Sequence, residues 1–226
     1  TVAVAPGEPE RLRGPEGVEV EAEPGTQMVG VSWTGPLVVD VEVRARGDGA
    51  WTDWVDLHAD DSSGAGRPGA GPAWLGADGA DAVAVRIPSD PVTDVRLDLM
   101  RFDGAGARSG PRATTIDTPV TPAGGPPVHT RAAWAPGGWN SAPAVCPAAP
   151  IVMDDLRFAV VHHTAGSNSY SAADVPGILA GIYHFHTASR GWCDIAYNFL
   201  VDRFGRVWEG RTGGIHAAPW GGHTLG

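Results

Sequence analysis

The strongest constraint on the fold is a series of short, valine-rich segments in the first half of the chain. Between residues 39 and 46, apolar side chains at odd positions alternate with charged ones at even positions. Such alternation buries one face of a strand and leaves the other in water, as in an antiparallel sheet. Similar segments, separated by Gly, Pro and Asp, are VEVEAE, MVGVSW, LVVDVEVRAR, WTDWVDLH, AVAVRI and DVRLDLM. The pattern predicts an all-β sandwich over residues 1–102.

A change of composition follows this region. Residues 103–130 are mainly Gly, Pro, Thr and Ala, which is typical of a linker. Beyond it, LRFAVVHH indicates a strand, and YNFLVD and RVWEG indicate a hairpin. VPGILAGIYHFH indicates an amphipathic helix, with Asp174 as its N-cap and Pro176 in its first turn. This order predicts a second domain of α/β class over residues 131–226.

Charge and hydropathy exclude several classes of function. The net charge is −10, all basic residues are Arg, and residues 1–120 carry the acidic excess. Without a basic cluster, such a chain is a poor candidate for binding nucleic acid or anionic lipid. No segment has the roughly 18 apolar residues that a membrane span needs. Because position 1 is Thr and not Met, we expect that the chain starts at a processed end.

Histidines are concentrated in the second half, where seven of the eight lie between residues 129 and 223. His162 and His163 are adjacent at the end of a predicted strand, so only one of them can face a given cleft. Neither this pair nor the His184-x-His186 pair has a common zinc spacing, such as His-Glu-x-x-His. Spacing alone therefore leaves open a metal site or ordinary surface and core histidines. The two cysteines, Cys146 and Cys193, are either free thiols or a disulfide, depending on the compartment.

Three ordered strings carry a resemblance to a known family. VVHHTAG, SRGWCDIAYNFLVDRFGRVWEGR and GGHTLG resemble the peptidoglycan recognition protein family, which is related to the type 2 N-acetylmuramoyl-L-alanine amidases. The resemblance runs from about Arg131 to the end of the chain. It implies a mixed sheet with helices for the second domain. Residues 17–102 look like the β-rich domain that precedes this module in some secreted bacterial amidases.

The resemblance implies a reaction and a metal. The family cleaves the amide between N-acetylmuramic acid and L-alanine in peptidoglycan, with Zn²⁺ held by two His and a Cys or Asp. His162 matches the first ligand, with His163 as its structural neighbour, and Tyr197 matches the catalytic tyrosine. A phenol can donate a hydrogen bond to a developing oxyanion, and a zinc-bound water can act as the nucleophile. The structural alternative for Tyr197 is an ordinary half-buried strand residue.

Substrate contacts are also implied. Gly191, Trp192 and Arg211 match the positions of family members that prefer diaminopimelic acid in the stem peptide. This is chemically reasonable, because arginine pairs with carboxylates in a bidentate manner. The alternative for Arg211 is a solvated arginine at a strand end. The resemblance further makes Thr164, His186 and His223 residues that line the groove.

Location and completeness are implied as well. A secreted, wall-associated protein would join Cys146 to Cys193 in a disulfide. The family's module continues beyond GGHTLG with a strand, a helix and two further zinc ligands. We therefore expect the second domain to be incomplete within these 226 residues, with a sheet edge left bare.

Two other functions remain open. Some family members bind peptidoglycan, the expected partner, without cleaving it. Alternatively, the β-sandwich acts as a wall- or carbohydrate-binding module through exposed aromatic rings. The candidates for such a platform are Trp33, Trp51, Trp54 and Trp74, which could equally belong to the sandwich core.

Overall fold

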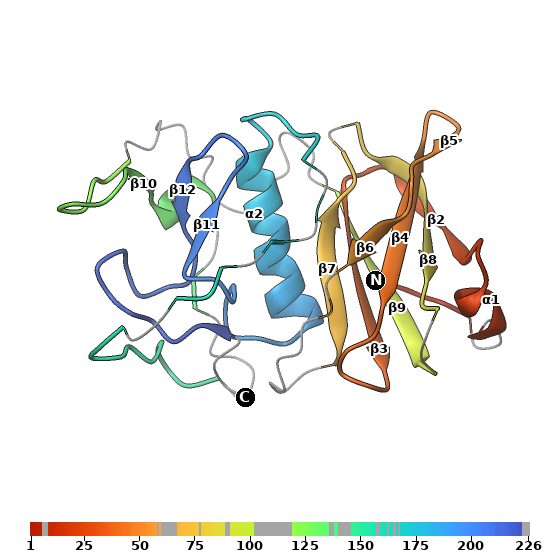
Figure 1. Cartoon of the computed structure of the whole chain (residues 1–226), viewed down its shortest axis with the longest axis horizontal. Coiled ribbons are helices and arrows are strands. Elements are labelled where there is room, and N and C mark those ends of the chain that lie inside the picture. Colours follow the sequence, from red (N-terminus) through yellow and green to blue (C-terminus); the bar gives the residue numbers. More distant parts are fainter. Residues whose placement is uncertain are drawn as a thin grey trace. The chain divides into compact units, whose positions relative to one another are not determined.

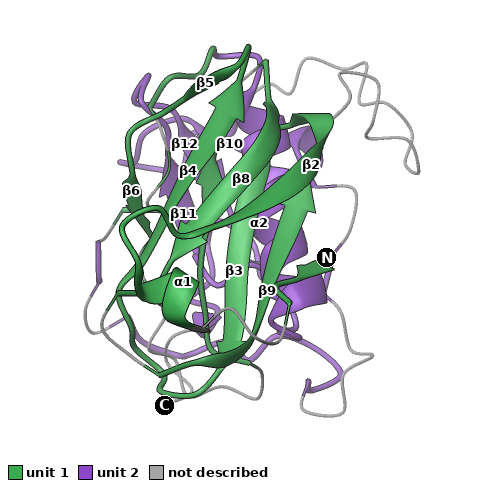
Figure 2. Cartoon of the chain, turned by 90° about the vertical axis from the view of Figure 1, so that its right-hand side faces the viewer, with its two compact units in different colours: residues 1–61, 67–102, 163–171 green, residues 62–66, 103–162, 172–226 purple. Residues whose placement is uncertain are grey.

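The computed structural model describes most of the chain and divides it into two compact units (Figure 2). The described residues are 1–5, 9–57, 59, 67–76, 78–88, 91–101, 119–135, 138–139, 146–156, 159–161, 163–164, 166 and 168–222. Unit 1 comprises Thr1–Asp61, Arg67–Phe102 and His163–Ser171, and unit 2 comprises Ser62–Gly66, Asp103–His162 and Ala172–Gly226. Two predicted site residues, His162 and His223, lie outside the described residues.

Unit 1 contains two antiparallel sheets and one short helix, α1 (Pro9–Arg13). One sheet has the order β1 (Val2–Ala3), β9 (Thr93–Met100), β3 (Met28–Thr34) and β7 (Gly69–Trp74). The other has the order β2 (Val18–Thr26), β8 (Ala80–Arg86), β4 (Val41–Gly47) and β5 (Ala50–Trp51), with β6 (Val55–Leu57) also paired to β4. Figure 1 labels β2 to β9 of these strands.

A single hydrophobic core joins the two sheets of unit 1. It includes Val31 and Trp33 of β3, Leu97 of β9, Val43 of β4 and Val85 of β8. Along β4, Val41, Val43 and Ala45 are buried and the even positions are half-buried, as the alternating pattern predicts. The predicted N-terminal β-sandwich is therefore confirmed, because the period of two places one face of each sheet in a shared core.

The sequence did not predict β7. Its sequence, GAGPAW, contains the residues that normally mark turns and interrupt strands. Gly71 has φ of +93°, and the register between β3 and β7 shifts near it. Pairing with β3 therefore outweighs the weak local preference of this segment, and a bulge absorbs the irregular residues.

Residues 163–171 belong to unit 1 although they lie far along the sequence. The indole Nε1 of Trp74, at the end of β7, donates a hydrogen bond of 3.3 Å to the carbonyl of Ser169. A Cβ on Gly166 would lie 3.1 Å from the backbone nitrogen of Trp74. The segment that follows the two adjacent histidines thus packs closely against β7.

Unit 2 contains a three-stranded mixed sheet and one long helix. The sheet order is β10 (Val128–His129), β12 (Val207–Glu209) and β11 (Phe199–Val201), with β10 parallel and β11 antiparallel to β12. The β11–β12 hairpin is the one predicted. A 3-10 turn, η1 (Arg131–Ala133), follows β10.

The predicted helix is present as α2 (Val175–His184) and continues as a π-helical turn, η2 (Phe185–Ser189). Its apolar side chains at Val175, Leu179 and Ile182 are buried, as the helical period predicts. Pro176 lies in the first turn, where its missing N–H has no cost. Asp174 occupies the N-cap position but makes no side-chain capping hydrogen bond.

The predicted strand LRFAVVHH is wrong in those of its residues that the structure describes. Leu156 and Ala159–Val161 have no strand structure, and Val160 and Val161 are 75% and 94% exposed. A strand requires a hydrogen-bonded partner, and no described strand pairs with these residues. No helix in the described ranges is long and apolar enough to cross a membrane.

Candidate functional site

His186 is the centre of an aromatic cluster in unit 2. It lies in the π-helical turn and is 1% exposed. Its ring centroid is 4.7 Å from that of Trp192 and 5.4 Å from that of Tyr197. The backbone N–H of Ala196 donates to its Nδ1 over 3.2 Å, so a neutral imidazole carries its proton on Nε2. The structure thus brings together three of the residues predicted from the family resemblance.

The loop that leads from the π-helical turn to Trp192 depends on a glycine. Gly191 has φ of +70°, a conformation that a side chain would strain. The next backbone N–H, that of Trp192, donates to the carbonyl of His186 over 2.9 Å. On the same loop, the guanidinium of Arg190 stacks 4.8 Å from the centre of the Trp192 ring. Gly191 therefore lets the chain reverse and place Trp192 against His186.

A buried carboxylate fixes the segment between Trp192 and Tyr197. Asp194 is fully buried and accepts a charged hydrogen bond of 2.6 Å from Nη2 of Arg131. Its other oxygen accepts the backbone N–H of Thr212 over 2.8 Å. Asp194 thereby joins three separate segments of unit 2 near Tyr197.

Tyr197 itself is half-buried, and its backbone carbonyl accepts the N–H of Arg211 over 2.8 Å.

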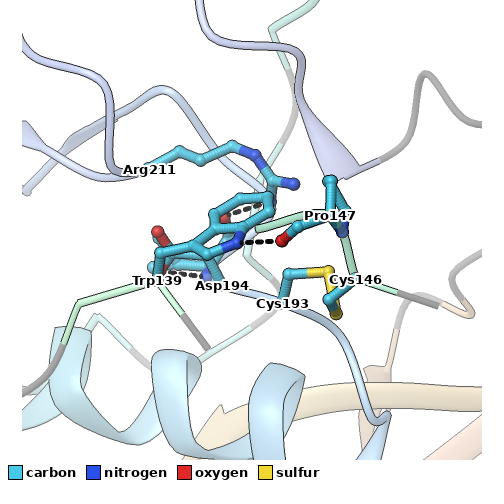
Figure 3. Close-up of a disulfide and its surroundings, with 7 residues drawn as sticks. Trp139, Cys146, Pro147, Cys193, Asp194 and Arg211 are labelled. Atoms are coloured by element: carbon cyan, nitrogen blue, oxygen red, sulfur yellow. Dashed lines mark hydrogen bonds between the residues drawn. A yellow bond between two sulfur atoms is a disulfide. The ribbon is translucent and has the colours of Figure 1, made fainter. Parts of the chain in front are cut away.

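Arg211 is buried, in contrast to the solvated strand-end alternative (Figure 3). Its Nη1 donates to the carbonyl of Ile195 over 2.9 Å, and its guanidinium lies 5.0 Å from the centre of the Trp139 ring. The indole Nε1 of Trp139 donates to the carbonyl of Pro147 over 2.8 Å. Burial lowers the pKa of Arg211 from its usual value, although the charge of Asp194 opposes that shift.

The disulfide between Cys146 and Cys193 is present, with 5.5 Å between the two Cα atoms. It links the residue before Pro147 to the residue before Asp194. This confirms the pairing that the family resemblance implied.

The remaining predicted residues are not part of this cluster. Thr164 and His163 are both exposed, and both belong to unit 1. Among the described residues, no group of three His, Cys, Asp or Glu side chains could hold a metal ion. Arg131, Trp139 and Asp194 were not among the residues predicted from the sequence, although an acid within the apolar CDIAYNF string was a signal for a buried ion pair.

The four tryptophans proposed as an aromatic platform divide into two pairs. Trp33 and Trp74 are buried in unit 1. Trp51 and Trp54 are half-buried, and the guanidinium of Arg44 lies 4.8 Å and 4.6 Å from their ring centres. The guanidinium of Arg86 lies 4.4 Å from the centre of the Trp54 ring. The second pair therefore belongs to a ladder of alternating rings and cations on the outer face of a sheet.

Comparisons with known proteins give two kinds of match. Residues 6–123 match a family described as Rv3811 N-terminal galactose-binding domain-like. Peptidoglycan-recognition protein SC1a of Drosophila melanogaster is 42% identical over 74 residues, which is 31% of this chain and 40% of that protein. Peptidoglycan recognition protein 1 of Bos indicus is 36% identical over 94 residues, which is 40% of this chain and 48% of that protein. The chain spans at most about half the length of these relatives, and no solved structure matches it.

Proposed function

Because this chain belongs to the Rv3811 N-terminal galactose-binding domain-like family and also resembles peptidoglycan recognition proteins, we propose that it acts on peptidoglycan. The proposed reaction is zinc-dependent hydrolysis of the amide between N-acetylmuramic acid and L-alanine. The proposed location is outside the cell, at the wall. The disulfide supports this location, because such bonds persist in oxidising compartments.

The observation that carries the proposal is the cluster of His186, Trp192 and Tyr197 around one buried loop. These residues come from the GWCDIAYNF region that resembles the recognition proteins. A cluster with aromatic faces beside an arginine is chemically suited to a stem peptide. Trp192 is 8% exposed and contacts Arg190 and His186, so it holds the loop in place. The guanidinium of Arg211 is the group that a carboxylate of diaminopimelic acid would seek.

Zinc remains a proposal that rests on the resemblance. The described residues do not supply a set of three ligands, and catalytic zinc sites require about three. His162, the proposed first ligand, lies outside the described residues. We therefore assign roles only to this chain's own groups. Tyr197 would donate a hydrogen bond to the oxygen that gains charge, and Gly191 would keep the loop clear for the stem peptide.

The decisive experiment is incubation of the full-length protein, which would include any further zinc ligands, with a muramyl tripeptide, with and without added Zn²⁺, followed by mass spectrometry. Release of the free tripeptide that depends on zinc is the expected result. Parallel substrates that contain diaminopimelic acid or lysine test the stem-peptide preference. Absence of cleavage, with a protein shown to be folded by circular dichroism, would contradict the amidase proposal.

Binding without cleavage is the second candidate, because recognition through Arg211 needs no metal. Co-sedimentation with insoluble peptidoglycan tests it independently of the reaction. Retention on peptidoglycan without cleavage would support a recognition module, and absence of both would contradict the two candidates together.

A third candidate places carbohydrate binding on unit 1, as the description of its family suggests. An aromatic platform requires a ring face that a sugar can cover. Arg44 stacks on both Trp51 and Trp54, so this pair gives the candidate little support. Calorimetric titration with galactose, and comparison with the Trp54→Ala variant, would test it.

A further inference from the structure

The guanidinium of Arg211 lies 5.0 Å from the centre of the Trp139 ring, and the two side chains are drawn together in Figure 3. Arg211 is only 5% exposed, although it is a charged residue just beyond the end of β12. The inference drawn from this contact rests on the proposed function, because it concerns the recognition of a stem peptide.

The guanidinium of Arg211 is not fully satisfied in its buried position. It has five N–H donors, and Nη1 donates to the carbonyl of Ile195. Nε is buried and has no hydrogen-bond partner among the described residues. The nearest buried carboxylate, that of Asp194, pairs with Arg131. A buried cation with unused donors is costly, so the site favours an anion that could complete its hydrogen bonds.

Trp139 is held over this cation by a defined tether. Its Nε1 donates to the carbonyl of Pro147, and Pro147 follows Cys146. Cys146 is bonded to Cys193, which precedes Asp194. The acceptor of the indole hydrogen bond is therefore attached covalently to the segment beside Arg211. Rotation of the indole away from Arg211 requires loss of this single hydrogen bond and of the cation–π contact.

We propose that Trp139 is a specificity-determining residue, which covers a carboxylate-binding guanidinium and admits a ligand only when the indole moves aside. The ligand class is a peptide with a side-chain carboxylate, which arginine binds in a bidentate manner. A peptide with a lysine at the same position has no side-chain carboxylate there to pair with the uncovered guanidinium. The indole therefore controls access for one class of stem peptide and not for the other.

The test measures the accessibility of Arg211 directly, by modification of arginine with p-hydroxyphenylglyoxal and peptide mapping by mass spectrometry. Exposed Arg203 serves as the internal reference. We expect Arg211 to react slowly in the wild-type chain and at least about tenfold faster in Trp139→Ala, since access scales with the uncovered fraction. Trp139→Phe retains a ring but loses the hydrogen bond to Pro147, so it should be intermediate.

Two results would overturn the proposal: equal modification of Arg211 and Arg203 in the wild-type chain, or no increase in Trp139→Ala. Circular dichroism shows whether each variant is folded, and Trp139→Phe preserves the test if the alanine variant is not.

A second measurement links accessibility to recognition. Calorimetry with muramyl tripeptides should show that Trp139→Ala gains affinity for the diaminopimelic acid peptide and not for the lysine peptide. An equal change for both peptides would overturn the assignment of specificity. If neither peptide binds any variant, the proposed function fails, while the modification rates still decide whether Trp139 covers Arg211.

Discussion

The carboxylate of Asp194 lies 2.6 Å from the guanidinium of Arg131, which is 63 residues earlier in the chain. The two groups hold η1 against the segment that leads to Tyr197. Asp194 is fully buried, and its carboxylate also accepts the backbone N–H groups of Ile195 and Thr212. Unit 2 is therefore organised around a polar contact as well as around the apolar face of α2.

We expect Asp194→Ala to reduce the free energy of unfolding by about 3–5 kcal/mol, because it removes a fully buried carboxylate that pairs with Arg131 and accepts two backbone N–H groups. Urea denaturation followed by circular dichroism measures the change. Asp154→Asn is the matched control, since that carboxylate is exposed in the same unit and should have little effect. A loss below about 1 kcal/mol, within the range of surface ion pairs, would contradict the structural importance of this pair.

The β11–β12 hairpin should weaken in acid because of Asp202. Burial raises the pKa of this carboxyl, but hydrogen bonds from Trp208, Arg206 and Phe204 outweigh burial and hold the pKa below its usual value. A group whose pKa is lower in the folded state stabilises the fold above its unfolded pKa of about 4. That contribution is lost as the pH falls through the lower, folded value.

We therefore predict a drop in the urea midpoint below about pH 4 that is smaller in Asp202→Asn than in the wild-type chain. At pH 7 the same variant should be less stable than the wild-type chain. Identical pH profiles for the two proteins would show that Asp202 does not contribute.

Tyr197→Phe removes the hydroxyl and retains the ring that contacts His186. If Tyr197 stabilises a developing oxyanion, kcat for muramyl tripeptide hydrolysis should fall by roughly 10²–10³, with KM nearly unchanged. Retention on peptidoglycan should be the same for both proteins. A variant that keeps its kcat would restrict Tyr197 to a packing role.

Trp74→Phe tests the contact between β7 and residues 163–171. The variant loses the hydrogen bond to the carbonyl of Ser169, which contributes about 0.5–1.5 kcal/mol in typical cases. Hydrogen exchange in residues 163–171 should accelerate by up to about tenfold. Trp33→Phe is the control. It also loses an indole hydrogen bond within unit 1, but the acceptor is the carbonyl of Pro36 and not a residue of 163–171. Equal acceleration in both variants would indicate general loosening of unit 1.

The sequence was most informative where the spacing of apolar residues follows the period of a strand or a helix. The alternation along β4 and the apolar stripe of α2 each identify a buried face, because one face of the element must leave water. LRFAVVHH has the composition of a strand, but composition does not supply a pairing partner, and Val161 remains exposed. β7 shows the opposite case, in which a partner strand orders a segment that has poor local preference.

The candidate site was only partly predictable for a related reason. The family resemblance predicted His186, Trp192 and Tyr197, whose rings lie close together. It also predicted the disulfide, whose Cys193 follows Trp192 in the sequence. It did not reveal that Arg211 is covered, since Trp139 is 72 positions away and is brought there by the fold. Contacts between distant segments, such as Asp194 with Arg131, have no local signature in the sequence.

The position of residues 163–171 in unit 1 affects how the protein can be divided for study. A recombinant fragment that starts at residue 131 would carry these residues without Trp74 and the rest of β7. A fragment that ends at residue 102 would expose the indole N–H of Trp74 to water. One cut in the Gly- and Pro-rich region therefore separates residues 163–171 from the rest of unit 1, because the polypeptide returns to its first unit after leaving it.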